Sequence, residues 1–339
     1  MGPIPWRSLS GPAARPYSRR TGTSDPTSTG TRRHSVFAPP PEIAARVVAS
    51  VPAAPPHGGA PLPWLADRPQ YRGLGSFLEG PAFDRAGRLL CVDVAHGRIL
   101  RGAPDGPFET LAAWDGAPNG LAIHRDGRLF VADHLRGLLA FDPRTGACTT
   151  VLPRAFGEPF KGLNDLVFDV DGALWFTDQG QTGLQDPSGR LYRLAADGRL
   201  DVVLDGIPSP NGVALDPRGT AIWLAVTRAN QVWRLPLAAG GRVTKVGVFV
   251  QLQGSGPDGL AVADDGSVWV AQPGIGSIWG FSEHGEPIAR IRSANGGRMT
   301  TNLAFTAPAD GSLVFVESTT GTIQRADVGR AGTPLFAWA

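Results

Sequence analysis

The chain has 339 residues, a formal net charge of +2 and 42% hydrophobic residues, enough for one large domain or two ordinary ones with a substantial core. Residues 1–40 hold six arginines and one acid, so the rest of the chain carries 26 basic and 29 acidic residues, which does not suggest a nucleic-acid partner. No apolar stretch is long enough to span a bilayer, so no membrane partner is expected.

Residues 1–40 differ in composition from the rest of the chain. They are rich in Ser, Thr, Pro, Gly and Arg and lack the apolar core of a secretory signal. This composition predicts a disordered N-terminal tail, with a targeting segment or a misassigned start codon as the alternatives. Cys91 and Cys148 are too few for a disulfide framework or a zinc ribbon, so we expect a reducing, cytoplasmic location.

A short pattern recurs six times in the remainder, residues 41–339. Each copy has a polar residue, an apolar strand, a turn containing glycine and a second apolar strand. The six copies are EGPAFDRAGRLLCVD, PNGLAIHRDGRLFVAD, LNDLVFDVDGALWFTD, PNGVALDPRGTAIWLAVT, PDGLAVADDGSVWVA and TNLAFTAPADGSLVFVES. A third strand follows each copy: GRILR, GLLAFD, GRLYRL, NQVWRL, GSIWGF and GTIQRA.

The spacing of the copies predicts the fold. The first polar residues of the copies, here called the leading residues, are separated by 40, 45, 47, 47 and 44 residues: Glu79, Asn119, Asn164, Asn211, Asp258 and Asn302. A period in the forties with several strands per unit is typical of a β-propeller. We therefore predict an all-β, six-bladed β-propeller over 41–339, with most tryptophans in the contacts between blades. Residues 42–52 (EIAARVVASVP) are expected to add an outer strand to the last blade.

The repeat also predicts where the polar residues lie. The first strand of a propeller blade lines the central channel, so the six leading residues should form a ring at one mouth of the channel. The second strand returns to the same face, so the residues after it should border this mouth: His96, His134, Gln179, Arg228, Gln272 and Glu317 with Ser318. Residues 177–190 (TDQGQTGLQDPSGR) could cover the mouth or form an ordinary solvated loop.

The leading residues offer oxygen ligands and no sulfur or imidazole. Two carboxylates, Glu79 and Asp258, would repel each other near one axis unless a cation lay between them. Carboxylate and amide oxygens suit a hard divalent cation. The alternative is that Asn-Gly and Asp-Gly pairs are ordinary turns. Glu79-Gly80 and Asn164-Asp165 fit that alternative less well, because Glu is a poor turn former and no glycine follows Asn164.

Four of the copies resemble a known family. EGPAFD, GLNDLVFD, SPNGVALD and GPDGLAV, in this order, are similar to the metal-site motifs of the gluconolactonase/regucalcin (senescence marker protein) family. The resemblance covers roughly residues 40–328 and implies a six-bladed propeller with one divalent cation in the channel. Calcium is the first expectation, with magnesium, manganese or zinc as alternatives. The matching ligands are Glu79, Asn164, Asn211 and Asp258.

The resemblance implies hydrolysis of a small-molecule lactone. A cation can polarise the lactone carbonyl, and a carboxylate can take a proton from water. The residue that matches the family's general base is Asp258. Asn119, Asn302, His134 and Gln179 are expected to contact substrate, although a histidine in an exposed loop is commonly only solvated.

One position departs from the family pattern. Sugar-lactonase members carry an arginine that contacts substrate two residues before the Asn of the Asn-Asp motif, and this chain has Gly162 there. The substrate could therefore differ from a sugar lactone even with the same metal site. A phosphotriesterase or lyase with the same metal, and a propeller that binds a partner without catalysis, remain the alternatives. No nucleophile elbow of the G-x-S-x-G type is present.

Overall fold

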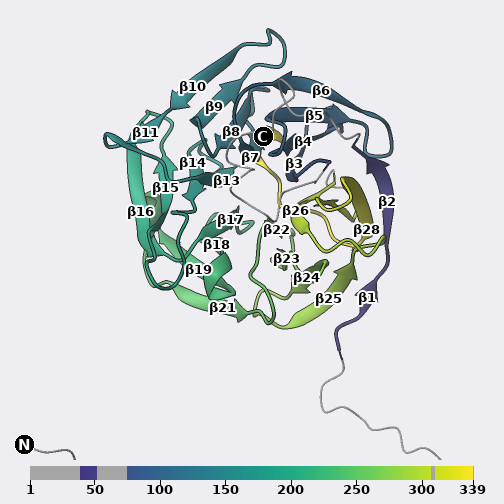
Figure 1. Ribbon diagram of the computed structural model, residues 1–339. Helices are drawn as coiled ribbons and strands as arrows, with labels where there is room; N and C mark the ends of the chain where they lie inside the picture. Colours follow the sequence, from purple (N-terminus) through teal and green to yellow (C-terminus); the bar gives the residue numbers. More distant parts are fainter. Residues whose placement is uncertain (1–38, 52–74, 307–309, 339) are drawn as a thin grey trace, which may run out of the picture. The chain divides into compact units, whose positions relative to one another are not determined.

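A computed structural model describes residues 39–51, 75–306 and 310–338, and in this part of the chain the strands form a six-bladed β-propeller (Figure 1). The six copies of the repeat form the six blades, in chain order, as the sequence predicted. The predicted tail, residues 1–40, lies almost entirely outside the described residues. No helix of the described residues is long and apolar enough to cross a membrane.

The first three blades each contain four antiparallel strands. Blade 1 contains β3 (Leu78–Phe83), β4 (Leu89–Asp93), β5 (Arg98–Gly102) and β6 (Phe108–Ala113). Blade 2 contains β7 (Pro118–Ile123), β8 (Leu129–Asp133), β9 (Gly137–Phe141) and β10 (Cys148–Leu152). Blade 3 contains β13 (Leu163–Phe168), β14 (Leu174–Asp178), β15 (Gly189–Leu194) and β16 (Leu200–Ile207). A small hairpin, β11 (Arg154–Ala155) and β12 (Glu158–Pro159), precedes blade 3.

The last three blades are less regular. Blade 4 contains β17 (Pro210–Leu215), β18 (Ala221–Val226), β19 (Gln231–Ala238), β20 (Arg242–Val243) and β21 (Gly247–Gln251). Blade 5 contains β22 (Leu260–Val262), β23 (Val268–Gln272), β24 (Ser277–Phe281) and β25 (Pro287–Arg292). Blade 6 contains β26 (Thr300–Phe305), β27 (Ser312–Glu317) and β28 (Thr322–Asp327). The described residues also contain three short 3-10 turns: η3 (Thr227–Ala229), η4 (Ala239–Gly241) and η5 (Phe336–Trp338).

The N-terminal strands close the ring. β2 (Ala45–Ser50) pairs antiparallel with β28 and supplies the fourth strand of blade 6, which confirms the predicted outer strand. β1 (Glu42–Ile43) pairs in parallel with β25 of blade 5, a contact that the sequence did not predict. The beginning of the described chain therefore holds blades 5 and 6, and Figure 1 shows both strands along the outer edge of the propeller.

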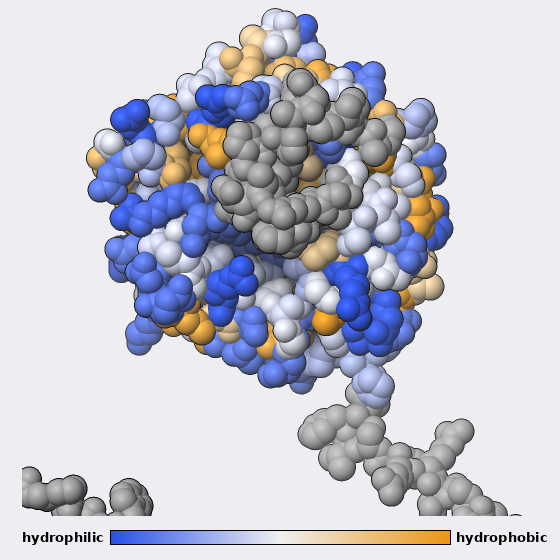
Figure 2. Space-filling view, viewed as in Figure 1, coloured by the Kyte–Doolittle hydropathy of each residue, from blue (hydrophilic) through white to orange (hydrophobic). Residues whose placement is uncertain are grey.

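The core lies between the blades. The buried hydrophobic residues form six main clusters, each shared by two neighbouring blades; for example, Phe130 and Leu138 of blade 2 pack with Phe168 and Phe176 of blade 3. Trp175 and Trp269 are 1% and 0% exposed, as expected for tryptophans between blades. Around the rim, the face in Figure 2 is mostly hydrophilic, with hydrophobic side chains scattered among the polar ones. Packing between neighbouring blades thus fixes the inner strands, which carry the leading residues.

Candidate functional site

The leading residues lie where the innermost strands leave regular pairing. In β13 the register with β14 shifts between Leu163 and Leu166, so Asn164 and Asp165 fall within the irregular step. Equivalent shifts occur at the beginning of the innermost strand in blades 1, 2, 4 and 6. A bulge of this kind redirects a side chain and is common next to functional sites. It explains why these strands begin on polar residues.

The glycines after four leading residues allow close contact between neighbouring blades. A Cβ on Gly80 would lie 2.7 Å from the backbone N of Leu121, and a Cβ on Gly212 would lie 2.4 Å from the backbone O of Asp258. Gly120 and Gly259 meet the next blade in the same way. Asn119-Gly120 and Asn211-Gly212 are therefore parts of strands β7 and β17 rather than turns. Glycine is required here for close approach of two backbones.

The contacts between successive blades bring the leading residues together in one ring. A Cβ on Gly120 would lie 2.6 Å from the backbone O of Asn164, and a Cβ on Gly259 would lie 2.2 Å from Oδ1 of Asn302. Blade 6 meets blade 1 through Thr301, whose hydroxyl donates to the backbone O of Leu78 at 2.8 Å. Five leading residues are buried: Glu79, Asn164, Asn211, Asp258 and Asn302. Asn119 is half-buried.

The electrostatics of the ring are unusual for a purely structural element. Burial, together with Asp258 and Asp165, raises the pKa of Glu79 well above its ordinary value. Burial and Asp165 raise the pKa of Asp258 to about 8. The side chains of Asn302 and Asn211 lower these two pKa values in part. Buried like charges of this kind are stabilised by a bound cation or by protonation.

Asp165 also belongs to this charged group, although it is not among the ligands that the family resemblance implies. It is 8% exposed, and burial raises its pKa to about 7. Its carboxylate accepts the N–H of Leu166 at 2.9 Å and that of Val213, in the next blade, at 3.2 Å. Asp165 therefore ties β13 to β17. In four other copies a glycine follows the leading residue, and here Asp165 takes that position. This difference is the sequence signal for the third carboxylate.

The donor set fits a hard divalent cation. Within the part of the chain that the structure describes, no three His, Cys, Asp or Glu side chains are grouped so that they could hold a metal by themselves. A cation at the ring would therefore need the amide oxygens of Asn164 and Asn211 beside the carboxylates. Such mixed oxygen sets suit calcium, which accepts many oxygen ligands in flexible arrangements.

Five of the residues predicted around the mouth divide into two groups. Gln272 and Glu317 are 1% and 0% exposed, and their side chains hold neighbouring loops: Glu317 accepts the N–H of Met299 at 2.8 Å, and Gln272 donates to the backbone O of Ser255 at 2.7 Å. His96 is also buried, and its Nδ1 lies 2.8 Å from Asp93. These three are structural. His134 and Gln179, by contrast, are half-buried and follow directly after β8 and β14.

The loops of the mouth are held by carboxylates at the ends of the second strands. Asp93 accepts the N–H of Phe77 at 2.9 Å, and Asp133 accepts that of Ala117 at 3.1 Å. Asp178 does the same for Lys161 at 3.0 Å. Each of these bonds joins the end of a second strand to the segment that leads into the first strand of the same blade. In blades 1 to 3, charge-assisted bonds from buried carboxylates thus hold the segments that lead into the first strands.

The loop between β14 and β15 is held by its own hydrogen bonds. The hydroxyls of Thr182 and Ser188 lie 2.9 Å apart, and Ser188 also donates to the backbone O of Gly180 at 3.1 Å. A Cβ on Gly183 would lie 3.8 Å from Arg228, so the loop reaches toward blade 4. These contacts order the loop, and its residues 184–187 are exposed, as in the solvated alternative.

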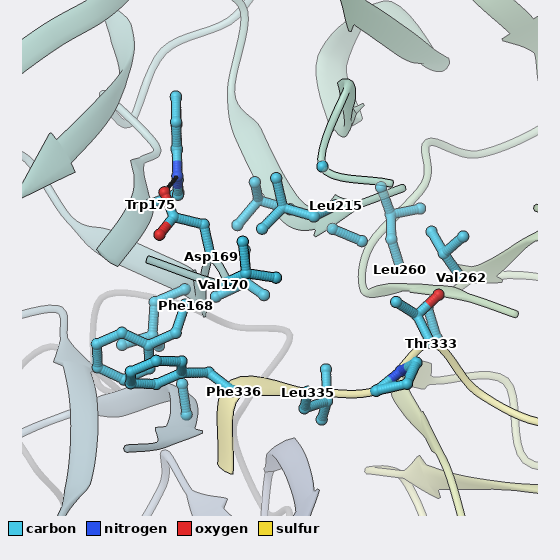
Figure 3. A pocket seen from close by; sticks show the side chains of 18 of the residues that line it. Phe168, Asp169, Val170, Trp175, Leu215, Leu260, Val262, Thr333, Leu335 and Phe336 are labelled. Carbon is cyan, nitrogen blue, oxygen red and sulfur yellow. Dashed lines mark hydrogen bonds between the residues drawn. The ribbon is translucent and has the colours of Figure 1, made fainter. Parts of the chain in front are cut away.

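The other end of the channel is a cavity of about 490 Å³. Its inner end touches Asp165 and Asn302, and its outer end is lined by the hairpins that join the first and second strands and by the C-terminal segment 332–338. Figure 3 shows Phe168 beside Phe336, and Asp169 bonded to Trp175, among mainly aliphatic walls. Carboxylates at this end accept hairpin N–H groups; Asp84 bonds Ala86 and Arg88 in this way.

Comparison with known proteins gives the family. The model for the SMP-30/Gluconolactonase/LRE-like region matches residues 77–321. A gluconolactonase of Zymomonas mobilis is 28% identical over 279 residues, 73% of this chain and 77% of the relative. The lactonase drp35 of Staphylococcus aureus is 30% identical over 245 residues, 68% of this chain and 72% of the relative.

Solved structures show the same fold. A calcium-binding protein, regucalcin, of Agrobacterium tumefaciens superposes with a TM-score of 0.69 at 24% identity, over 88% of this chain and 98% of that one. A gluconolactonase of Xanthomonas campestris gives a TM-score of 0.66 at 24% identity, over 83% of this chain and 98% of that one. With the family model matching most of the propeller, the chain belongs to the SMP-30/gluconolactonase/LRE-like family.

Proposed function

We propose that this protein is a lactone hydrolase that depends on one divalent cation, with calcium as the first candidate. The observation that carries the proposal is the buried group of carboxylates at the ring, whose raised pKa values call for a cation. The proposed ligands are Glu79, Asn164, Asn211 and Asp258. The names of the relatives, gluconolactonase and lactonase, support the reaction class, and the calcium-binding regucalcin supports the cation.

A cation bound at the ring would polarise the lactone carbonyl and stabilise the negative charge that develops on its oxygen. We propose Asp258 as the general base. Its carboxylate takes a proton from water as the water oxygen adds to the carbonyl carbon. The C–O bond of the ring ester then breaks, and the proton passes to the departing alkoxide, so that the product is a hydroxy acid.

The other ring residues hold this geometry. Asp165 bonds backbone N–H groups of both β13 and β17, so it fixes the strands that carry Asn164 and Asn211. Glu79 is proposed as a ligand that takes no proton during the reaction. Asn119 and Asn302 in the ring, with His134 and Gln179 at the mouth, are proposed to contact the lactone.

The test is metal analysis of the purified protein followed by a hydrolysis assay. The expected result is close to one divalent cation per chain and turnover of at least one lactone, lost after chelation and restored by calcium. A parallel assay with phosphotriesters distinguishes the alternative reaction. Full lactone turnover after exhaustive chelation would contradict the metal-dependent mechanism, and no lactone turnover by the metal-loaded protein would contradict the reaction.

A further inference from the structure

The proposed reaction takes place at the ring and gives no part to the cavity at the hairpin end of the channel. The volume of this cavity, about 490 Å³, lies within the range of about 300–1,000 Å³ that is common for small-molecule sites. Figure 3 shows that its walls are mostly apolar; they include Phe168, Leu215 and Val262 from the first strands of three blades, and Leu335 and Phe336 from the C-terminal segment. The larger part of a ligand held here would therefore be a hydrocarbon chain or ring.

The cavity is open to solvent beside the C-terminal segment. Val170, in the first hairpin of blade 3, and Leu335 both line the cavity, and both have exposed side chains. Apolar side chains at the edge of a concave site are a surface that a ligand with an apolar body would cover. A ligand can therefore enter this end of the channel without the opening of a blade.

An arginine in the cavity wall has unused hydrogen-bond donors. Arg193 lines the cavity, and only 14% of its side chain is exposed. Among the residues that the structure describes, its guanidinium makes no hydrogen bond, and its buried Nε has no partner. The ion pair with Asp169 spans 3.8 Å, which is longer than a hydrogen bond. Buried donors of this kind are normally paired, so the guanidinium is suited to an acceptor that a ligand supplies.

Asp169 neutralises this arginine only in part. Its carboxylate accepts the N–H groups of Asp171 and Ala173 at 3.1 and 2.8 Å, and Nε1 of Trp175 donates to it at 2.9 Å. These three bonds hold the carboxylate to its own hairpin, 3.8 Å from the guanidinium. The positive charge of Arg193 is therefore left available to a second anion.

Two neighbours hold Arg193 in position before any ligand binds. Its guanidinium carbon lies 5.5 Å from the centre of the Trp175 ring. On the side of blade 4, a Cβ on Gly241 in turn η4 would lie 3.1 Å from Nε of Arg193. The indole and the turn thus fix the side chain in the folded protein, which lowers the entropy cost of binding.

Blade 4 has an arginine at the same position of its repeat, in different surroundings. Arg234 pairs with Trp223 across β18 and β19, as Arg193 pairs with Trp175 across β14 and β15. Its guanidinium carbon also lies over the indole, 5.6 Å from the ring centre. Arg234, by contrast, is exposed and lies outside the cavity wall, so water can satisfy its donors. The stacked pair thus belongs to the repeat, and the cavity distinguishes Arg193.

We propose that this cavity is a binding site for an amphipathic monocarboxylate, whose carboxylate bonds Arg193 and whose hydrocarbon part fills the apolar space. A planar guanidinium can bind a carboxylate through two parallel hydrogen bonds. Arg193 supplies one positive charge, and Asp169 and Asp216 lie in the same wall, so a doubly charged phosphate monoester is opposed. A cationic amphiphile is repelled by the guanidinium. This site is independent of the reaction proposed at the ring.

The test is calorimetric titration of the full-length protein at pH 7 with decanoate, decan-1-ol, decylamine and acetate, each below the concentration at which micelles form. A chelator is present throughout, so that no probe can bind a cation at the ring. The wild-type protein is expected to bind one decanoate per chain, at least about tenfold more tightly than decan-1-ol or decylamine. Acetate, which lacks the hydrocarbon chain, is expected not to bind measurably.

Three variants locate the site. Arg193→Gln should weaken decanoate binding at least about tenfold and leave decan-1-ol binding within about twofold, because only the charge-assisted bonds are lost. The matched variant in blade 4, Arg234→Gln, should leave both affinities unchanged. Leu335→Asp places a carboxylate at the cavity entrance and should also weaken decanoate binding.

The comparison of probes on the wild-type protein needs no variant to fold. Absence of decanoate binding, or equal affinities for decanoate, decan-1-ol and decylamine, would overturn the inference. Equal losses of decanoate affinity in Arg193→Gln and Arg234→Gln would also overturn it, because the anion would then not be held by the arginine of the cavity.

Discussion

The two ends of the innermost strands carry acidic residues with opposite surroundings. At the hairpin end, Asp84 accepts two backbone N–H groups at 2.9 Å and pairs with Arg88 at 2.7 Å. At the ring end, Glu79 and Asp258 are buried near Asp165, and their pKa values are raised. One repeat thus supplies carboxylates in two settings: those at the hairpins stabilise turns, and those at the ring are the ones that we propose bind a cation.

The largest expected effect comes from changing one carboxylate at the ring. Asp258→Asn should reduce lactone turnover by about 10²- to 10⁴-fold, because the general base is lost. The matched hairpin variant, Asp84→Asn, should leave turnover within about twofold. Steady-state kinetics on the calcium-loaded proteins would check this. Similar losses in both variants would mean that the two ends of the strands do not differ in function.

The pH dependence of stability should also separate the ring from the hairpins. The pKa of Asp258 is about 8 and that of Asp165 about 7 in the folded protein, both above the ordinary value of 3.8. Between these values the folded state binds more protons than the unfolded state, so the free energy of unfolding falls as pH rises. The cation-free protein should therefore be less stable at pH 8 than at pH 5.

Denaturant unfolding of the chelated protein at these two pH values measures this effect. Added calcium should reverse part of the loss at pH 8, because a ligand that binds only the folded state stabilises it by about 2.7 kcal/mol at 100 times Kd. Asp258→Asn should show a smaller fall between pH 5 and pH 8. A cation-free protein that becomes more stable over this range would contradict the electrostatic account of the ring.

A pair of glycine variants tests the packing of the ring. Gly80 and Gly87 both have positive φ, 52° and 74°, but only a Cβ on Gly80 would meet the next blade. Gly87→Ala should cost about 1 kcal/mol from its backbone conformation. Gly80→Ala should cost about 1 to 3 kcal/mol more, because blade 2 must shift. Equal losses in chemical denaturation would show that close approach of the strands is unimportant.

The smallest effect is expected at the hairpin end. Asp84→Ala removes the acceptor for two turn N–H groups and should lower the free energy of unfolding by about 1 to 2 kcal/mol. The calcium-dependent part of the stability should not change. Denaturation with and without calcium measures both quantities, and a weaker calcium response in this variant would link the hairpins to the ring.

Much of the fold followed from the sequence because a propeller repeats one pattern. Asn164, Asn211 and Asp258 occupy equivalent positions in their copies of the repeat, which predicted that they share a ring. The structure brings them together. The glycines after the leading residues were harder to interpret. A glycine in a turn and a glycine beside another backbone look alike in sequence, and only the contacts between blades distinguish them.

Contacts between loops could not be predicted. The parallel pairing of Glu42–Ile43 with β25 depends on where the first described strand meets a blade far along the chain. The contact of His134 and Gln181 with Gly162 depends on two loops from different blades. The departure at Gly162 was visible in the sequence, but which side chains fill the space was not, because loop conformation is not encoded in a repeat.

The measurement that tests the central claim most directly is calcium titration of the chelated protein by calorimetry at pH 7, in buffers of different ionisation enthalpy. The account predicts one calcium per chain and release of protons on binding, because Asp258 and Glu79 have raised pKa values without the cation. Glu79→Gln and Asp258→Asn should bind calcium much more weakly, while Asp84→Asn should bind it normally. No calcium binding by the wild-type protein, or equal binding by all four proteins, would contradict the account.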